Sequence, residues 1–124
     1  MNIVYVAAGG ALGCICRYGM VSLIYTYCQT KFPWGTFSVN MLGSLLIGLL
    51  YGSLAVNGVM DEKVRMLLFI GFLGGFTTFS SFALENMHLL QESRYITALA
   101  YTLGSNVLGI FAAFAGYWIS QLFK

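Results

Sequence analysis

Charge is the property that this sequence has least of. Only 8% of its 124 residues are charged and 59% are apolar, whereas soluble domains have about 25% charged and roughly 45–50% apolar residues. So few charges cannot cover a water-facing surface, which excludes a soluble globular fold and indicates an integral membrane protein. The net charge of +2 is small, and the basic residues form no patch, so a nucleic-acid partner is not expected.

Cysteine, histidine and catalytic motifs are equally sparse. Cys14, Cys16 and Cys28 form neither a CxxC pair nor a metal-ligand spacing, and an odd count does not favour a disulfide framework. We interpret them as small apolar residues packed in helices. The single histidine, with no GK[ST], GxSxG or HExxH motif in the sequence, leaves no basis for an enzyme.

Long apolar runs take the place of charge. Residues 32–60, 66–84 and 95–123 contain no charged residue, and 3–28 contain only Arg17, so each run is long enough to cross about 30 Å of hydrocarbon. The N-terminus has no basic region followed by a cleavage site, and we interpret it as the first span and not a signal peptide. We predict one all-α transmembrane domain over residues 1–124, with helices over about 3–28, 34–57, 64–91 and 95–122. Short connections favour an up-down-up-down bundle with both termini on one side.

Basic residues are balanced between the two ends of this bundle. Lys63, Arg65 and Lys124 lie at the end with the termini, and Lys31, Arg94 and Arg17 lie toward the other. Because this bias orients membrane proteins, its absence indicates insertion in both orientations and allows an antiparallel homodimer. Small residues recur at four-residue spacing, which permits close helix contact either within one chain or between two. These residues are Gly9 and Gly13; Ser44, Gly48 and Gly52; Gly109 and Ala113; and Ala112 and Gly116.

The third span carries its polar residues in one segment, GGFTTFSSF, at residues 74–82. The paired glycines let the helix unwind near 74–78, and irregular backbone inside a membrane is tolerated only where it is buried in protein or lines a cavity. Freed carbonyls there are good ligands for a small hard cation. Beyond the break, helical geometry places Thr78, Ser81, Phe82 and Glu85 on one face, with Phe79 at its margin. Phenyl edges and hydroxyls can both face an anion.

Other polar groups within the spans have two interpretations each. The Asn40 amide is either interhelical glue or an anion donor, and the same choice applies to Tyr101 and Ser105, which lie one turn apart. Arg17 either snorkels to the interface or attracts anions into a vestibule. His88 and Glu92 are interpreted as interfacial and receive no role. An anion path of neutral donors avoids a fixed cation that would hold the ion too tightly.

Three segments carry a resemblance along essentially the whole chain: GGALGCICRY (9–18), WGTFSVNMLGSLLIG (34–48) and GFLGGFTTFSSF (71–82). In this order and spacing the sequence resembles the small fluoride channels of the Fluc or CrcB family. The third segment is the most specific. Two departures are mild, since Ser81 stands where the family often has Thr, and Cys14 where it often has Ala.

The resemblance implies an antiparallel, dual-topology homodimer in the inner membrane of a bacterial or archaeal cell, which passively exports fluoride through two pores. It also implies a structural sodium ion at the dimer centre, bound by the backbone carbonyls of Gly74 and Thr77 from both subunits. Arg17 matches the arginine that ends the first motif. The implied pore residues are Asn40, Thr78, Phe79, Ser80, Ser81, Phe82, Glu85, Tyr101 and Ser105.

Two alternatives compete with a fluoride channel. One is a small dual-topology, proton-coupled exporter of the multidrug type, in which Glu85 would be the proton-coupled site. That family places its key acid in the first helix, where this chain has Arg17 and no acid. The other is a non-conducting assembly subunit, for which a glycine break and a polar face have no use. The residues alone do not choose fluoride over chloride; that choice comes from the resemblance.

Overall fold

The computed structural model describes residues 2–123, and within this range it is entirely helical. Four segments are long and apolar enough to cross a membrane, namely Asn2–Tyr27, Trp34–Ala55, Glu62–Gln91 and Tyr95–Leu122. The predicted all-α membrane fold with four spans is therefore confirmed. The chain is a multi-pass membrane protein.

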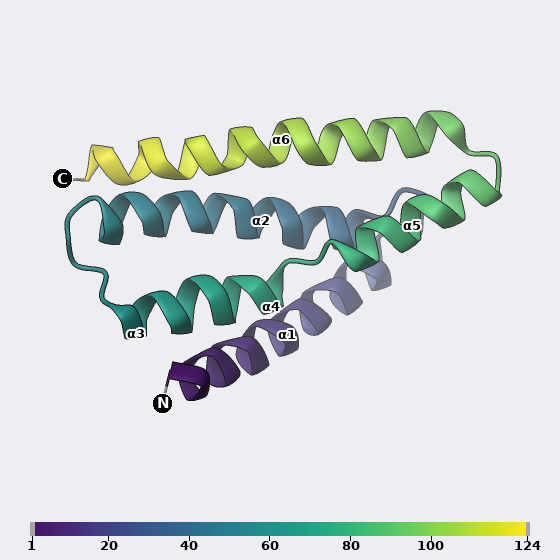
Figure 1. Ribbon diagram of the computed structural model, residues 1–124. Helices are drawn as coiled ribbons and strands as arrows, with labels where there is room; N and C mark the ends of the chain where they lie inside the picture. The colour runs from purple at the N-terminus through teal and green to yellow at the C-terminus, as the bar shows by residue number, and fades with distance from the viewer. Residues whose placement is uncertain (1, 124) are drawn as a thin grey trace.

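The spans are built from the following elements. The first is α1 (Asn2–Tyr27), and the second is α2 (Trp34–Leu50) continued by the π-helical turns η1 (Tyr51–Ala55). The third contains α3 (Glu62–Val64), the π-helical η2 (Arg65–Leu73), α4 (Gly74–Phe76) and α5 (Ser80–Gln91), and the fourth is α6 (Tyr95–Leu122). The spans alternate in direction, so both ends of the chain lie at one end of the bundle (Figure 1). Lys124, counted above among the basic residues, lies outside the described residues.

Glycines bring the backbones of neighbouring helices into direct contact. A Cβ at Gly48 would overlap the Ala113 carbonyl on α6, and one at Gly116 would overlap the Leu45 carbonyl on α2. On α1, Gly9 and Gly13 face carbonyls of η2 in the same way. Figure 1 shows α2 and α6 running side by side along their length. These glycines therefore serve packing within one chain, which is one of the two uses that their spacing allowed.

Few side chains are buried inside this bundle. Val39 and Tyr101 alone among the large side chains of residues 2–123 are fully buried, and the main cluster joins Leu89, Ala98 and Tyr101 with Phe32, Phe37 and Phe82. Most large apolar side chains point outward, as expected for a surface that faces lipid. All three cysteines are exposed as well. Cys14 and Cys16 lie on α1, which buries only Gly9 and Gly13, and Cys28 follows the end of that helix.

Candidate functional site

The helical hydrogen-bond pattern of the third span stops after Phe76 and starts again at Ser80. Thr77 has extended backbone, with φ −87° and ψ 159°. Its amide and its hydroxyl both donate to the Leu73 carbonyl, at 3.0 and 2.8 Å. The interval over residues 77–79 thus leaves several backbone groups to be satisfied from elsewhere, because polar groups in an apolar medium are costly without partners.

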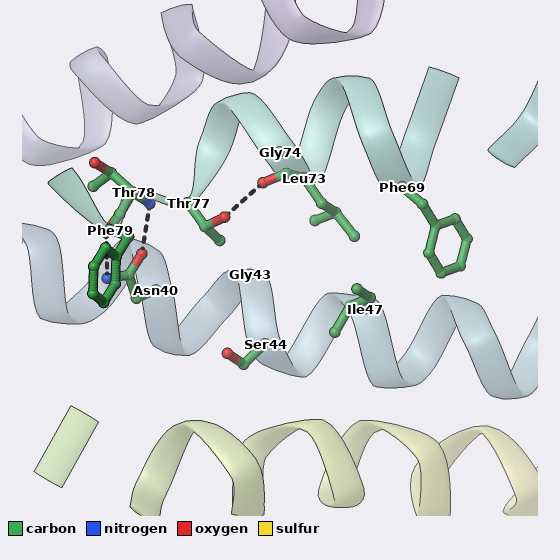
Figure 2. Close-up of a pocket in the computed structure, with 10 residues that line it drawn as sticks. All are labelled: Asn40, Gly43, Ser44, Ile47, Phe69, Leu73, Gly74, Thr77, Thr78 and Phe79. Atoms are coloured by element: carbon green, nitrogen blue, oxygen red, sulfur yellow. Dashed lines mark hydrogen bonds between the residues drawn. The ribbon is translucent and has the colours of Figure 1, made fainter. Parts of the chain in front are cut away.

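Asn40 on α2 satisfies one residue of this interval completely. Its Nδ2 donates to the Thr78 carbonyl at 3.0 Å, and its Oδ1 accepts from the Thr78 amide at 2.9 Å (Figure 2). The side chain therefore holds the backbone of the third span against α2, as the interhelical interpretation supposed. One N–H of the amide has no protein partner among residues 2–123 and is left for another acceptor.

Arg17 on α1 satisfies a second group. Its Nε donates to the Gly75 carbonyl at 3.0 Å across the interface between α1 and α4. A guanidinium at the last carbonyls of a helix is favoured by the partial negative charge there. The structure thus shows a carbonyl contact that neither sequence interpretation, snorkelling or a vestibule, included.

The carbonyl oxygens of Gly74 and Thr77 remain without a partner. No donor among residues 2–123 reaches either of them. Both residues line a groove of about 400 Å³ between α2 and the third span, together with Asn40, Gly43 and Ser44 (Figure 2). The described residues contain no cluster of His, Cys, Asp or Glu that would hold a metal, so backbone oxygens are the available ligands here. Such oxygens suit a hard monovalent cation.

The Glu85 carboxylate on α5 accepts hydrogen bonds from each of the other three spans. Its Oε2 accepts from the Tyr25 hydroxyl at 3.0 Å and the Thr36 hydroxyl at 2.9 Å, and its Oε1 accepts from the Tyr101 hydroxyl at 3.0 Å. These donors come from α1, α2 and α6. A partly buried carboxylate is tolerated within a membrane span when it is so fully hydrogen-bonded. We call Glu85 and its three donors the Glu85 cluster.

A row of rings leads from the surface to this cluster. Phe79 is 77% exposed, whereas Phe82 is partly buried. The ring centroids of Phe79 and Phe82 are 5.7 Å apart, and those of Phe82 and Tyr101 are 4.9 Å apart. The row ends where the Tyr101 hydroxyl binds Glu85. The rings of Phe79, Phe82 and Tyr101 therefore form a continuous row from the surface into the bundle.

The hydroxyls beside these rings have different surroundings. Thr78 lies before the start of α5, so the prediction that it shares a helical face with Ser81 and Phe82 is wrong. Its hydroxyl instead accepts a hydrogen bond from the Ser81 amide at 3.2 Å, in the first turn of α5. The Thr78 hydroxyl also lies 3.5 Å from the hydroxyl of Ser80, which is an exposed residue. On α6, the Ser105 hydroxyl is buried and has no partner among the described residues. A buried polar atom without a partner commonly marks the place of a water or an ion.

Three participants were missed from the sequence. Tyr25 and Thr36 complete the Glu85 cluster, and Asn86 accepts from the Thr102 hydroxyl at 3.0 Å and donates to the Phe82 carbonyl at 3.2 Å. Thr36 lies one helical turn before Asn40, so its position on the same face was a usable signal. No sequence spacing indicated Tyr25, because its contact depends on how α1 crosses the other helices.

Comparison with known proteins bears on this arrangement. Residues 4–117 match the family described as CrcB-like protein, Camphor Resistance (CrcB). The chain belongs to the CrcB family. The matched residues take in the interrupted third span and the Glu85 cluster, so the resemblance drawn from the three sequence segments is confirmed.

Curated CrcB relatives carry a common name. The chain is 40% identical to the fluoride-specific ion channel FluC of Magnetococcus marinus, over 98% of this chain and 99% of that protein. It is 48% identical to a protein of the same name from Thermus thermophilus, over 90% of this chain and 89% of that protein. The relative from Hahella chejuensis, also named FluC, is 42% identical over 98% of this chain and 95% of its own length. These names denote ion channels, a class without catalytic activity.

Proposed function

We propose that this CrcB protein is a fluoride-selective channel that passively exports fluoride from the cytoplasm, with two pores in an antiparallel homodimer. The observation that carries the proposal is the row of Phe79, Phe82 and Tyr101, which runs from an exposed ring to the Glu85 cluster. Relatives that match over nearly the whole chain are named fluoride-specific channels. The choice of fluoride as the transported ion rests on these names.

The path relies on neutral groups. The edges of Phe79 and Phe82 present the positive part of the ring quadrupole to the anion, while the free Asn40 N–H and the unpartnered Ser105 hydroxyl replace part of its water. Tyr101 contributes its ring, because its hydroxyl already donates to Glu85. The hydroxyls of Thr78, Ser80 and Ser81 lie beside the rings at the start of α5. The absence of a lysine or arginine from this row favours conduction, because ions must leave a site as readily as they enter.

A sodium ion fits the unpartnered carbonyls of the third span. Gly74 and Thr77 would hold it with their backbone oxygens, and the ion would fix the interval over residues 77–79 in one conformation. One chain offers two such oxygens, so a second copy related by a two-fold axis would bring the number to four. The proposed sodium site therefore requires the proposed dimer.

The groove beside these carbonyls is the surface where we place the second copy. It is lined by Gly43, Ile47 and Leu73 as well as by the polar interval (Figure 2). The small-residue pairs that were candidates for joining two chains are already used within one. An antiparallel partner also agrees with the even division of basic residues between the two ends.

Efflux from liposomes tests the proposed channel. Purified protein is reconstituted with fluoride or chloride inside, without a proton gradient, and the released ion is followed with an ion-selective electrode. We expect rapid fluoride release and no chloride release. Flux that requires a proton gradient, or equal release of both anions, would contradict the proposal and favour the exporter or a non-selective pore.

A single ring substitution tests the path. Phe82→Ile removes the ring edge between Phe79 and Tyr101, so we expect it to abolish fluoride efflux while the protein still elutes as a dimer. Phe111→Ile is the matched control, because Phe111 is 61% exposed on the outer side of α6. Undiminished flux in Phe82→Ile would remove this ring from the path.

A further inference from the structure

A small polar pocket lies at the end of the bundle away from both termini. It occupies about 200 Å³ between the connection over residues 28–33 and the second half of α5. Its lining includes Tyr25 and Glu85 on the inner side, and Lys31, His88 and Glu92 on the outer side. The pocket thus joins the Glu85 cluster to the surface of the molecule.

We propose that this pocket is the aqueous mouth through which the ion passes between the Glu85 cluster and the solution. The inference rests on the proposed channel function, and it assigns roles to Lys31, His88 and Glu92. Two members of the Glu85 cluster, Tyr25 and Glu85 itself, are also walls of the pocket. An ion that leaves the ring row beside Tyr101 therefore has the pocket as its adjoining space.

The size and chemistry of the pocket suit a hydrated anion. A water molecule takes about 30 Å³ in the liquid, so the pocket has room for a small ion with several waters. Its lining offers the His88 imidazole and the Lys31 ammonium group as donors, because the hydroxyls of Tyr25 and Thr30 already donate to Glu85 and to the Phe32 carbonyl. The pocket differs in this from the apolar groove between Tyr51 and Phe114, which has no polar lining.

The charges at the mouth are balanced between acids and cations. Glu92 is 3.7 Å from the Lys31 ammonium and 3.2 Å from Arg94 Nε, and all three side chains are about half exposed. Glu85 also lines the pocket, so Lys31 and Arg94 balance two acids, and Lys31 is the cation that lies in the lining itself. Its ammonium group attracts anions to this opening, and salt screens the effect.

The first experiment removes the charge of Lys31. Single-channel fluoride currents of wild type, Lys31→Gln and Lys63→Gln are recorded at fixed fluoride, with ionic strength varied by an impermeant salt. Lys63 is an exposed lysine at the opposite end of the bundle and does not line the pocket. At low ionic strength we expect Lys31→Gln to lower the current about twofold, and at high ionic strength to match wild type.

Equal currents in Lys31→Gln and wild type at low ionic strength would overturn the proposal. So would an equal reduction in Lys63→Gln, because the effect would then belong to the surface as a whole. The wild-type current is measured first. If wild type carries no fluoride current, the channel function is refuted. If wild type carries a current and either of these two results is found, only the assignment of the pocket as the mouth is refuted.

A second experiment tests access directly. In a background with Cys14, Cys16 and Cys28 replaced by serine, His88→Cys is treated with a bulky, charged, thiol-specific methanethiosulfonate reagent. We expect modification to block the fluoride current. Met87→Cys is the control, because Met87 is adjacent on α5 and exposed but does not line the pocket. Complete modification of His88→Cys, shown by mass spectrometry, with an unchanged current would overturn the proposal.

Discussion

Tyr101 illustrates how one residue serves both structure and path. It is fully buried, its ring packs against Phe82, and its hydroxyl is the only donor to Oε1 of Glu85 among the described residues. The sequence predicted Tyr101 and Glu85 as pore residues separately. It did not predict their hydrogen bond, because that contact depends on how α5 and α6 are rotated about their own axes.

Removing this hydroxyl should therefore cost more than an ordinary surface change. Tyr101→Phe leaves Oε1 of Glu85 without a donor, and we expect it to lower the free energy of unfolding by about 1–3 kcal/mol and to reduce fluoride flux. The measurement is thermal unfolding in detergent together with liposome efflux. Tyr95→Phe, at a position 62% exposed, should change stability by less than about 0.5 kcal/mol. Equal stability of the two variants would contradict the role assigned to the Tyr101 hydroxyl.

At the scale of helices, close glycine contacts determine how the spans pack. The contact between α2 and α6 brings Gly48 against the Ala113 carbonyl and Gly116 against the Leu45 carbonyl. Sequence patterns predicted the four helices well, because apolar run length follows directly from membrane thickness. They did not predict which small residues face which helix, since the same spacing suits contacts within a chain and between chains.

A methyl group at this contact tests the packing. In Gly48→Ala the new Cβ would overlap backbone of α6, so we expect a loss of about 1–3 kcal/mol in stability, seen as a lower unfolding temperature in detergent. Gly19→Ala is the matched control, because nothing lies within 4 Å of a Cβ there. The control should be neutral or more stable by about 0.5–1 kcal/mol. A stable Gly48→Ala variant would show that α2 and α6 are not in backbone contact.

The interrupted third span shows a limit of prediction within one element. The glycine pair was expected to unwind the helix, but Gly74 and Gly75 are helical and the interval falls over residues 77–79. The partners that satisfy its freed groups come from distant segments. Asn40 binds Thr78 and Arg17 binds Gly75. Such contacts between residues far apart in sequence have no local signal, so the role of Arg17 was not predicted.

At the scale of the whole molecule, a single chain leaves its proposed ion sites incomplete. Gly74 and Thr77 line an open groove, and Phe79 is largely exposed. In the proposed homodimer, a second copy would cover both. Assembly, the sodium site and conduction are thus expected to depend on one another.

Sodium removal tests this dependence. When sodium is replaced by a large organic cation at constant fluoride, we expect the dimer to weaken and the fluoride flux to fall, with recovery on adding sodium back. Assembly is followed by size-exclusion chromatography with light scattering, and flux by liposome efflux. If both are unchanged without sodium, the carbonyls of Gly74 and Thr77 do not hold a structural cation.

Selectivity is the central claim, and the reversal potential of a single channel tests it most directly. The protein is placed in a planar bilayer with sodium fluoride on one side and an equal concentration of sodium chloride on the other. We predict a reversal potential displaced by more than about 100 mV in the direction of fluoride permeation, since each tenfold preference corresponds to about 59 mV for a single charge. A reversal potential near zero would contradict the account.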